Sequence, residues 1–165
     1  MNENYNIRRA TAGDAQILAY IQTESWKAAF QNILEPEDLE QSTNPERATA
    51  MYQKLLDAKK GNGYILELEG KPHCIAWWDA ARDQDMTGYA ELICIHSLQD
   101  HWRKGYGSKM MEQILSDMEK AGYAHTLLWV FEKNIRARKF YEAKGFHKTE
   151  KAKEFCGAVE VMYEK

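Results

Sequence analysis

Two glycines one residue apart, Gly105 and Gly107, stand between an apolar run at 90–95 and an amphipathic helical pattern. Glycine lets the backbone turn tightly with its N–H groups directed inward. The first turn of a helix then offers unpaired amides and the positive end of its dipole to an anion. Arg103 and Lys104 add positive charge beside the turn. The order strand, glycine turn and helix therefore predicts a binding site for a phosphate or pyrophosphate group.

The same turn lacks the motifs of the standard nucleotide sites. A Walker loop needs G-x-x-x-x-G-K-[ST], which the sequence does not contain here. A dinucleotide fingerprint needs a third glycine at position 110, where the sequence has Met110. A lone G-x-G can also be a plain connection between two elements, so a second stretch must decide what the turn binds.

That second stretch runs from Leu127 to Phe146. Its first five residues, L-L-W-V-F, are typical of a buried strand. Asn134 is suited to cap the helix that follows, and Gly145 is suited to end that helix before the next strand begins.

The two stretches together resemble the GNAT superfamily of N-acetyltransferases. The acetyl-CoA loop of that family reads [Q/R]-x-x-G-x-[G/A], and this chain has both glycines but carries Trp102 where Gln or Arg is usual. The departure bears on how the outer edge of the loop is closed. The family's later block reads N-x-x-A-x-x-F-Y-x-x-x-G-F. This chain matches it at every specified position: Asn134, Ala137, Phe140, Tyr141, Gly145 and Phe146.

The resemblance implies a co-substrate and its place. It implies that acetyl-CoA binds without a metal, in a gap where the strands on either side of the loop's helix splay apart. It also implies that the pantetheine arm pairs with backbone at the end of the first of these strands. The implied cofactor-binding residues are Ile95, His96, Ser97, Arg103, Lys104, Gly105, Tyr106, Gly107, Ser108, Asn134 and Tyr141.

Direct acetyl transfer to an amine needs a proton acceptor for the amine and a proton donor for the departing thiolate. In the family, the tyrosine that matches Tyr141 points at the CoA sulfur, so Tyr141 is the candidate acid. A phenol pKa of about 10 lies close enough to a thiol pKa of about 8.5 for this transfer. The alternative is a core tyrosine packed beside Phe140. Asn134 could be a helix cap alone or also a hydrogen-bonding partner of CoA.

Glu91 is the candidate base. It interrupts the apolar run Y-A-E-L-I-C-I-H, where a buried carboxylate is costly unless it is paired or hydrated. The histone-acetylating branch of the family carries its catalytic glutamate at the corresponding place. A structural glutamate, or ordered water as the base, are the alternatives, and His96 is a weaker base candidate. Trp129 stands where relatives that acetylate ribosomal-protein N-termini tend to have a glutamate, which argues against their mechanism.

Trp26 and Phe30 are the candidate substrate-binding residues, although both could equally be core. The expected acceptor is the primary amine of a small molecule or peptide. Two alternatives stay open: a non-catalytic acyl-CoA-binding regulatory module, and an acyltransferase with another acyl donor or an oxygen acceptor.

The composition is ordinary for one globular domain, expected to span 1–165. The net charge of −3 gives no electrostatic case for nucleic acid or an anionic membrane. No apolar run reaches the roughly 20 residues of a membrane span. Three widely spaced cysteines indicate free thiols and a cytoplasmic location, and the histidines lack metal-like spacing. The sequence leaves a homodimer open.

The hydrophobic pattern predicts an α+β fold with a mixed, mostly antiparallel central sheet flanked by helices. Lys148 to Glu154 is interpreted as a solvated connection between the last two strands. The expected strands are 5–10, 63–69, 73–81, 89–96, 125–131, 146–149 and 158–163, and the principal helices are 15–30, a short one from Pro36, 45–60, 106–121 and 134–144.

Overall fold

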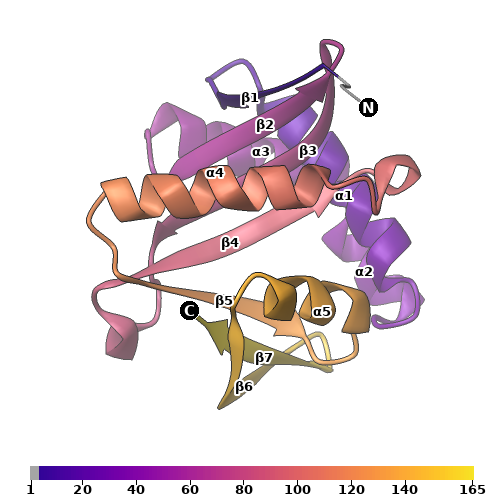
Figure 1. The fold of residues 1–165 in the computed structure, drawn as a ribbon. Coiled ribbons are helices and arrows are strands. Elements are labelled where there is room, and N and C mark those ends of the chain that lie inside the picture. Colours follow the sequence, from indigo (N-terminus) through magenta and orange to yellow (C-terminus); the bar gives the residue numbers. More distant parts are fainter. Residues whose placement is uncertain (1–3) are drawn as a thin grey trace.

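A computed structural model describes residues 4–165 (Figure 1). The helices are α1 (Ala15–Phe30), α2 (Pro36–Ser42), α3 (Pro45–Asp57), α4 (Tyr106–Lys120) and α5 (Ile135–Ala143), with short 3-10 turns at Gln84–Met86 and Gln99–His101. The strands are β1 (Tyr5–Arg9), β2 (Asn62–Leu68), β3 (Lys71–Ala80), β4 (Tyr89–Ser97), β5 (His125–Phe131), β6 (His147–Phe155) and β7 (Ala158–Glu164).

The strands form one mixed sheet in the order β1-β2-β3-β4-β5-β7-β6. Neighbouring strands pair antiparallel except β4 and β5, which are parallel and are joined by the crossover helix α4. The predicted α+β class, with a mostly antiparallel sheet flanked by helices, is confirmed.

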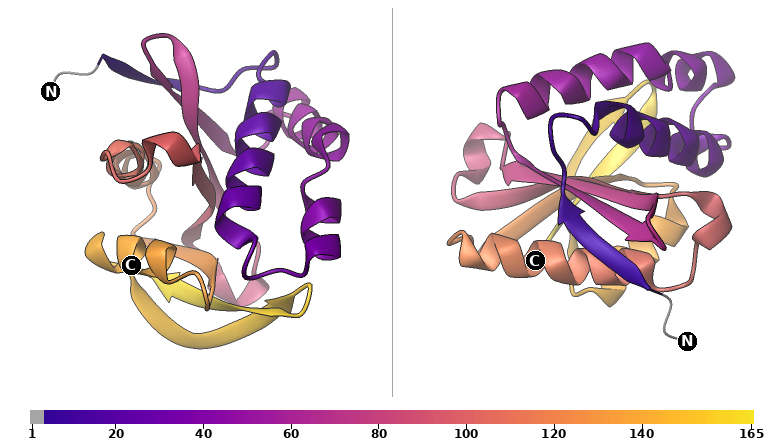
Figure 2. Two further views of the ribbon diagram at one scale, coloured as in Figure 1. Left: turned by 90° about the vertical axis from the view of Figure 1, so that its right-hand side faces the viewer. Right: turned by 90° about the horizontal axis from the view of Figure 1, so that it is seen from above.

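Helices cover both faces of the sheet (Figure 2). Methionines and Ile114 of α4 pack on one face, in a core that also contains Tyr141 of α5. Leu18 and Ile21 of α1, with Tyr52 of α3, pack on the other face. A group that lies in the gap between β4 and β5 can therefore contact side chains from the helices on both faces of the sheet.

The β4–β5 pairing covers only part of the two strands. Its register runs from Tyr89 opposite His125 to Leu92 opposite Leu128 and then stops. Residues 93–97 of β4 and 129–131 of β5 continue without pairing to each other, although both strands keep their outer neighbours. This is the splay that the resemblance implied.

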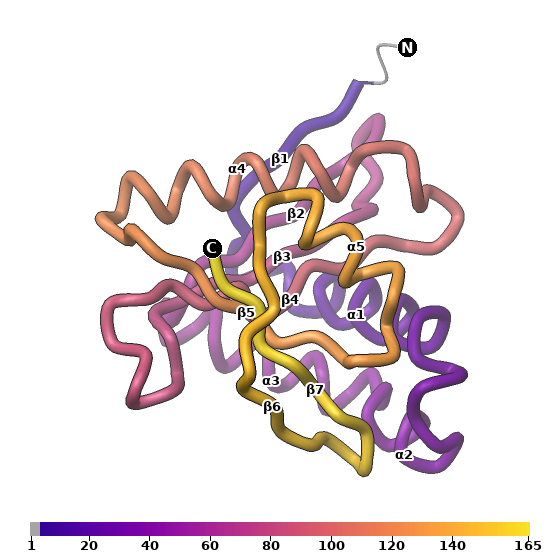
Figure 3. Tube along the Cα trace, turned by 60° about the horizontal axis from the view of Figure 1, so that its bottom comes forward, coloured from indigo at the N-terminus to yellow at the C-terminus, as the bar shows by residue number. Residues whose placement is uncertain are grey.

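The last hairpin differs from the expectation. The charged run that was interpreted as a solvated connection lies within β6, which extends to Phe155 and pairs with β7 (Figure 3). β6 lies at one edge of the sheet and is mostly exposed, and edge strands commonly carry lysine and other charges. A register shift between Lys148 and Ala152 also breaks the alternation by which a strand is usually predicted.

None of the helices within residues 4–165 is long and apolar enough to cross a membrane. The three cysteines are free thiols, with Cys74 buried, Cys94 half-buried and Cys156 exposed.

Candidate active site

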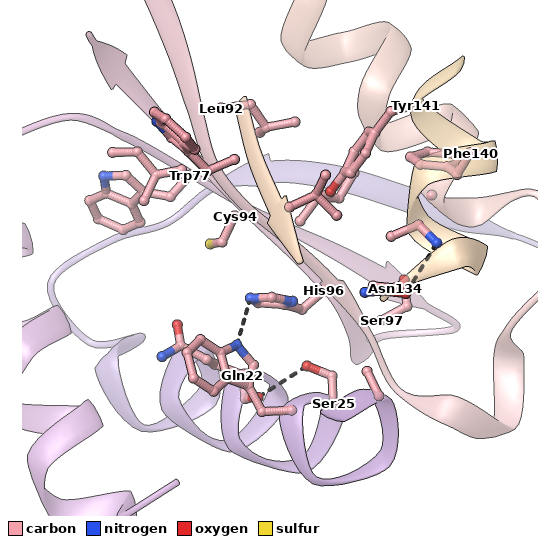
Figure 4. A pocket seen from close by; sticks show the side chains of 18 of the residues that line it. Gln22, Ser25, Trp77, Leu92, Cys94, His96, Ser97, Asn134, Phe140 and Tyr141 are labelled. Atoms are coloured by element: carbon pink, nitrogen blue, oxygen red, sulfur yellow. Dashed lines mark hydrogen bonds between the residues drawn. The ribbon is translucent and has the colours of Figure 1, made fainter. Parts of the chain in front are cut away.

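A cleft of about 1210 Å³ passes through the gap between the splayed strands. Its walls come from α1 and α3 on one side of the sheet, and from the loop before α4 and from α5 on the other. Figure 4 shows His96 and Ser97 on β4 facing Asn134, the N-cap of α5, and Tyr141 of α5 across this space. The cleft therefore brings together segments that are far apart in the sequence.

The glycine turn has the conformation that an anion site needs. Gly105 precedes α4 with a left-handed φ of 87°, a backbone conformation that glycine adopts most readily. The first bond within α4 runs from the Lys109 N–H to the Gly105 carbonyl oxygen, 3.1 Å away. The N–H groups of residues 106–108 precede that bond, so the first turn can offer them to a ligand.

Most of the loop residues predicted from sequence line the cleft, namely Arg103, Gly105, Tyr106, Gly107 and Ser108. Lys104 is exposed and lies outside the lining. The Tyr106 side chain is buried in the core, where its ring packs 5.5 Å from that of His73. Tyr106 can therefore serve a ligand through its backbone amide. Its side chain supports the loop from behind.

Three cations of the lining belong to the loop before α4 and to α5. Arg103 belongs to the loop before α4, and Arg136 and Lys139 belong to α5. A phosphorylated ligand laid against the first turn of α4 would meet these three cations as well as the free amides.

Trp102, at the position where the family usually has Gln or Arg, makes two contacts at the outer edge of the loop. Its indole N–H donates to the Ser97 carbonyl oxygen at 2.8 Å. The guanidinium of Arg136 lies over its ring, 3.6 Å from the centroid. Trp102 thus connects the end of β4 with the start of α5 at the outer edge of the loop.

The second predicted block is assembled as expected on α5. The Asn134 side-chain oxygen accepts a hydrogen bond from the Ala137 N–H at 3.2 Å, so the predicted cap is confirmed. Its amide NH₂ remains a potential donor toward the cleft. Phe140 lies above the glycine turn, because a Cβ added at Gly107 would meet its ring at 3.6 Å.

Tyr141 is 9% exposed, and its hydroxyl is directed into the pocket (Figure 4). Burial raises the pKa of Tyr141 well above its ordinary value. The nearby Cys94 thiol raises it further, while the positive charge of Arg136 opposes this. The phenol therefore keeps its proton at neutral pH and can donate it to a stronger base.

Glu91 is buried but not unpaired. One Glu91 carboxylate oxygen accepts hydrogen bonds from the backbone N–H of Arg82 at 3.0 Å and from the Nε of Arg82 at 3.2 Å. The other oxygen accepts from the Nη2 of Arg82 at 2.6 Å. The Glu91 side chain is 2% exposed, whereas that of Arg82 is 60% exposed. The carboxylate lines the cleft, but much of its accepting capacity is used by Arg82.

His96 is held by α1. The Trp26 indole N–H donates to His96 Nε2 at 3.2 Å, which places the proton of the neutral ring on Nδ1 (Figure 4). Burial lowers the pKa of His96 to about 4. His96 is consequently a neutral ring whose Nε2 lone pair is already engaged.

The predicted substrate-binding residues belong to an aromatic wall. Trp26 and Phe30 lie 5.0 Å apart by ring centroids, in an edge-to-face arrangement. Phe131 of β5 meets Phe30 at 4.9 Å, and Phe155 of β6 meets Trp26 at 6.0 Å. All four rings line the cleft on the side of the sheet covered by α1.

Sequence reasoning missed several residues of the cleft. Phe155 and Glu160 reach it through the β5–β7–β6 pairing, and Arg82 reaches it from the end of β3. A cationic partner such as Arg82 could have been predicted from Glu91, because a carboxylate in an apolar strand needs a partner when it is buried. Nothing in the sequence marked the other two.

Solved structures share the fold over nearly the whole chain. The coenzyme A complex of PaiA N-acetyltransferase from Thermoplasma acidophilum matches with a TM-score of 0.82 and 18% identity, covering 98% of each chain. YncA, an acetyltransferase structure from Salmonella typhimurium with acetyl-CoA, matches with a TM-score of 0.72 and 15% identity, covering 98% of this chain and 92% of that chain.

A curated relative is similar at the level of sequence. The chain is 26% identical to the probable N-acetyltransferase Rv2775 of Mycobacterium tuberculosis over 145 residues, which cover 87% of this chain and 80% of that protein. The family model of the acetyltransferase (GNAT) family matches residues 25–146. Since this match spans well over half of the 165 residues, the chain belongs to the GNAT family of acetyltransferases.

Proposed function

We propose that the protein is an acetyl-CoA-dependent N-acetyltransferase that moves an acetyl group directly to the primary amine of a small molecule or peptide. The position of the Tyr141 hydroxyl carries this proposal. It points into the space between α5 and the unpaired end of β4 (Figure 4), in a cleft whose lining also includes the glycine turn and the aromatic wall.

The cofactor half of the proposal rests on groups that suit CoA. The first-turn amides of α4 and the cations Arg103, Arg136 and Lys139 would hold the phosphates. Ile95, His96 and Ser97 offer strand backbone that β5 leaves unpaired, and Asn134 offers its amide. When bound, acetyl-CoA supplies the acetyl group as a thioester and departs as a thiol.

The chain's own groups then have defined tasks. The cleft holds the amine against the thioester carbonyl, which removes much of the barrier without a covalent enzyme intermediate. As the new C–N bond forms and the C–S bond breaks, Tyr141 donates its hydroxyl proton to the leaving sulfur. An amine that enters as an ammonium ion first releases one proton to solvent, which frees the nitrogen lone pair for attack. The second proton, lost as the amide forms, is passed through water and restores the phenol.

Glu91 is proposed to act on the amine proton through water. Its carboxylate lies in the cleft lining, but its contacts to Arg82 occupy both oxygens. A water that hydrogen-bonds to a remaining lone pair could accept the proton in its place. His96 is a poorer base, because its Nε2 already accepts from Trp26.

Thiol release with acetyl-CoA and a panel of amines, amino acids and peptides tests the proposal. Mass spectrometry of the product, with and without hydroxylamine, separates a stable amide from a labile ester. Stabilisation by acetyl-CoA without release on any acceptor would favour the acyl-CoA-binding module. Faster turnover with a longer acyl donor, or an ester product, would favour the other alternative. We also expect a cytoplasmic location, which cell fractionation tests. Light scattering tests whether the protein forms a homodimer.

A further inference from the structure

Glu160 of β7 is a half-buried carboxylate in the cleft lining. Within residues 4–165, its side chain has no hydrogen bond and no ion pair within 4.0 Å. Burial raises the pKa of Glu160, and the charges of Lys153 and Arg82 oppose that shift. The Glu160 oxygens are not among the buried atoms without a partner, so solvent reaches them, and an ammonium group can take the place of water there in a charge-assisted hydrogen bond.

The cation opposite Glu160 on the neighbouring strand does not fill this role. Lys153 of β6 stands directly opposite Glu160 in the β6–β7 register. Its ammonium nevertheless lies over the Trp129 ring, 4.1 Å from the centroid. Glu91, the other buried carboxylate of this region, is already engaged by Arg82. Glu160 therefore differs from its neighbours in having its accepting capacity free.

The aromatic wall adjoins this carboxylate. Phe131 is the register partner of Glu160 on β5, and its ring lies 6.2 Å from that of Phe155. With Trp26 and Phe30, these rings make one side of the cleft apolar and flat. Such a wall suits an apolar body of aromatic size, which gains from edge and face contacts with the rings.

The charged residues on this side of the cleft balance one another. Three are acidic and three are basic, so the region carries no excess negative charge that would select a polycation. A single unpaired carboxylate beside an aromatic wall matches a ligand with one ammonium group. The six charged residues are Lys60, Asp79, Arg82, Glu91, Lys153 and Glu160.

We infer that the acceptor is a primary monoamine on an apolar body of aromatic size, with Glu160 binding its ammonium group and the aromatic wall packing against its body. The inference rests on the proposed function, since it identifies the acceptor of the same site. Glu160 is thereby an acceptor-binding residue in addition to those derived above.

The test measures amine binding to the protein saturated with CoA, by isothermal titration calorimetry, so that no turnover is needed. The amines are 2-phenylethylamine, butylamine and spermidine. We expect 2-phenylethylamine to bind at least tenfold more tightly than either of the others. Glu160→Gln should weaken its binding about tenfold or more, because a charge-assisted hydrogen bond is lost.

Two further variants make the result specific. Glu154→Gln removes the same charge from an exposed residue of β6 that lies outside the cleft lining, and it should leave amine binding unchanged. Phe155→Ala should weaken binding of 2-phenylethylamine severalfold while butylamine changes little. Phe155 is 36% exposed, so this truncation should leave the fold intact.

Equal binding by Glu160→Gln and the wild type would overturn the role of Glu160. Tighter binding of spermidine, or no binding of 2-phenylethylamine, would overturn the acceptor class. Saturation with CoA in the same samples keeps these failures separate from failure of the proposed function, which would appear as an absence of CoA binding or of thiol release.

Discussion

The guanidinium of Arg136 stacks on the ring of Trp102, 3.6 Å from its centroid, and ties the start of α5 to the loop before α4. The Trp102 indole N–H is at the same time bonded to the Ser97 carbonyl oxygen. The two halves of the cofactor cleft are therefore held together at its outer edge by one tryptophan.

Arg136→Ala should weaken CoA binding about threefold to tenfold, because it removes a cation–π contact worth roughly 1 kcal/mol and a positive charge beside the phosphates. Lys133→Ala is the matched control, since it removes the same charge from an exposed residue just before α5, outside the cleft lining. Calorimetric titration with CoA measures both. Equal losses in the two variants would show that the contact with Trp102 contributes nothing.

Gly105→Ala should destabilise the protein by about 1–2 kcal/mol, because an L side chain is strained at φ 87°. An added Cβ there would meet nothing within 4 Å, so strain and not collision is the cause. CoA binding should also weaken as the turn shifts.

Gly122→Ala provides the control for that change. Gly122 has a similar φ of 96° and equally open surroundings, but it lies after the far end of α4. Urea unfolding should show a similar loss of stability for both variants, whereas calorimetry should show weaker CoA binding for Gly105→Ala alone. Unchanged CoA affinity in Gly105→Ala would contradict the assignment of the turn.

Stability should fall in mild acid. Burial lowers the pKa of His73 and of His96 to about 4, against about 6.5 in the unfolded chain. As the pH falls from about 6.5 to 4, the unfolded state takes up these protons first. The free energy of unfolding then decreases by up to about 1.4 kcal/mol per pH unit for each histidine.

Urea unfolding at pH 7.5, 6.0 and 5.0 measures this slope. His73 is 2% exposed, and neither ring nitrogen has a hydrogen-bond partner among residues 4–165, so His73→Phe should make the slope shallower. His125→Gln, at an exposed position at the start of β5, should leave the slope as it is. An identical slope in wild type and His73→Phe would contradict the prediction.

Glu91→Gln should lower the free energy of unfolding by about 1–3 kcal/mol. The change breaks the ion pair and points an amide donor at the Arg82 guanidinium, although Arg82 is exposed enough to turn toward water. Turnover should also fall, with a change in the acidic limb of its pH profile. Lost stability with an unaltered pH profile would mean that Glu91 holds Arg82 and does not handle the proton.

Features of the fold and the site that depend on neighbouring residues in the sequence could be predicted, whereas contacts between distant segments could not. Asn134 caps α5 and Gly105 takes a left-handed φ because their immediate neighbours dictate it, and both were predictable. The contact between Glu91 and Arg82 depends on how the chain turns between β3 and β4. Glu160 and Phe131 are brought together only by the pairing of β5 with β7, which no residue type in either strand predicts.

The same distinction explains the misread strand. β6 pairs with β7 on one side and has no strand on the other, so its side chains need not alternate between apolar and polar. The lysines and glutamates of β6 led to its interpretation as a connection. The contact of Phe155, at the end of β6, with the aromatic wall was therefore not predicted. Tertiary pairing, and not local propensity, made this segment a strand.

Amine-dependent thiol release by the wild type and by Tyr141→Phe, with thermal stabilisation by acetyl-CoA recorded on the same samples, tests the central claim most directly. Loss of the phenol should lower kcat about 100-fold, in the range for a general acid, while stabilisation by acetyl-CoA is retained because the ring still fills its place. Full activity of Tyr141→Phe would contradict its role as the acid. An absence of stabilisation by acetyl-CoA in the wild type would contradict the whole account.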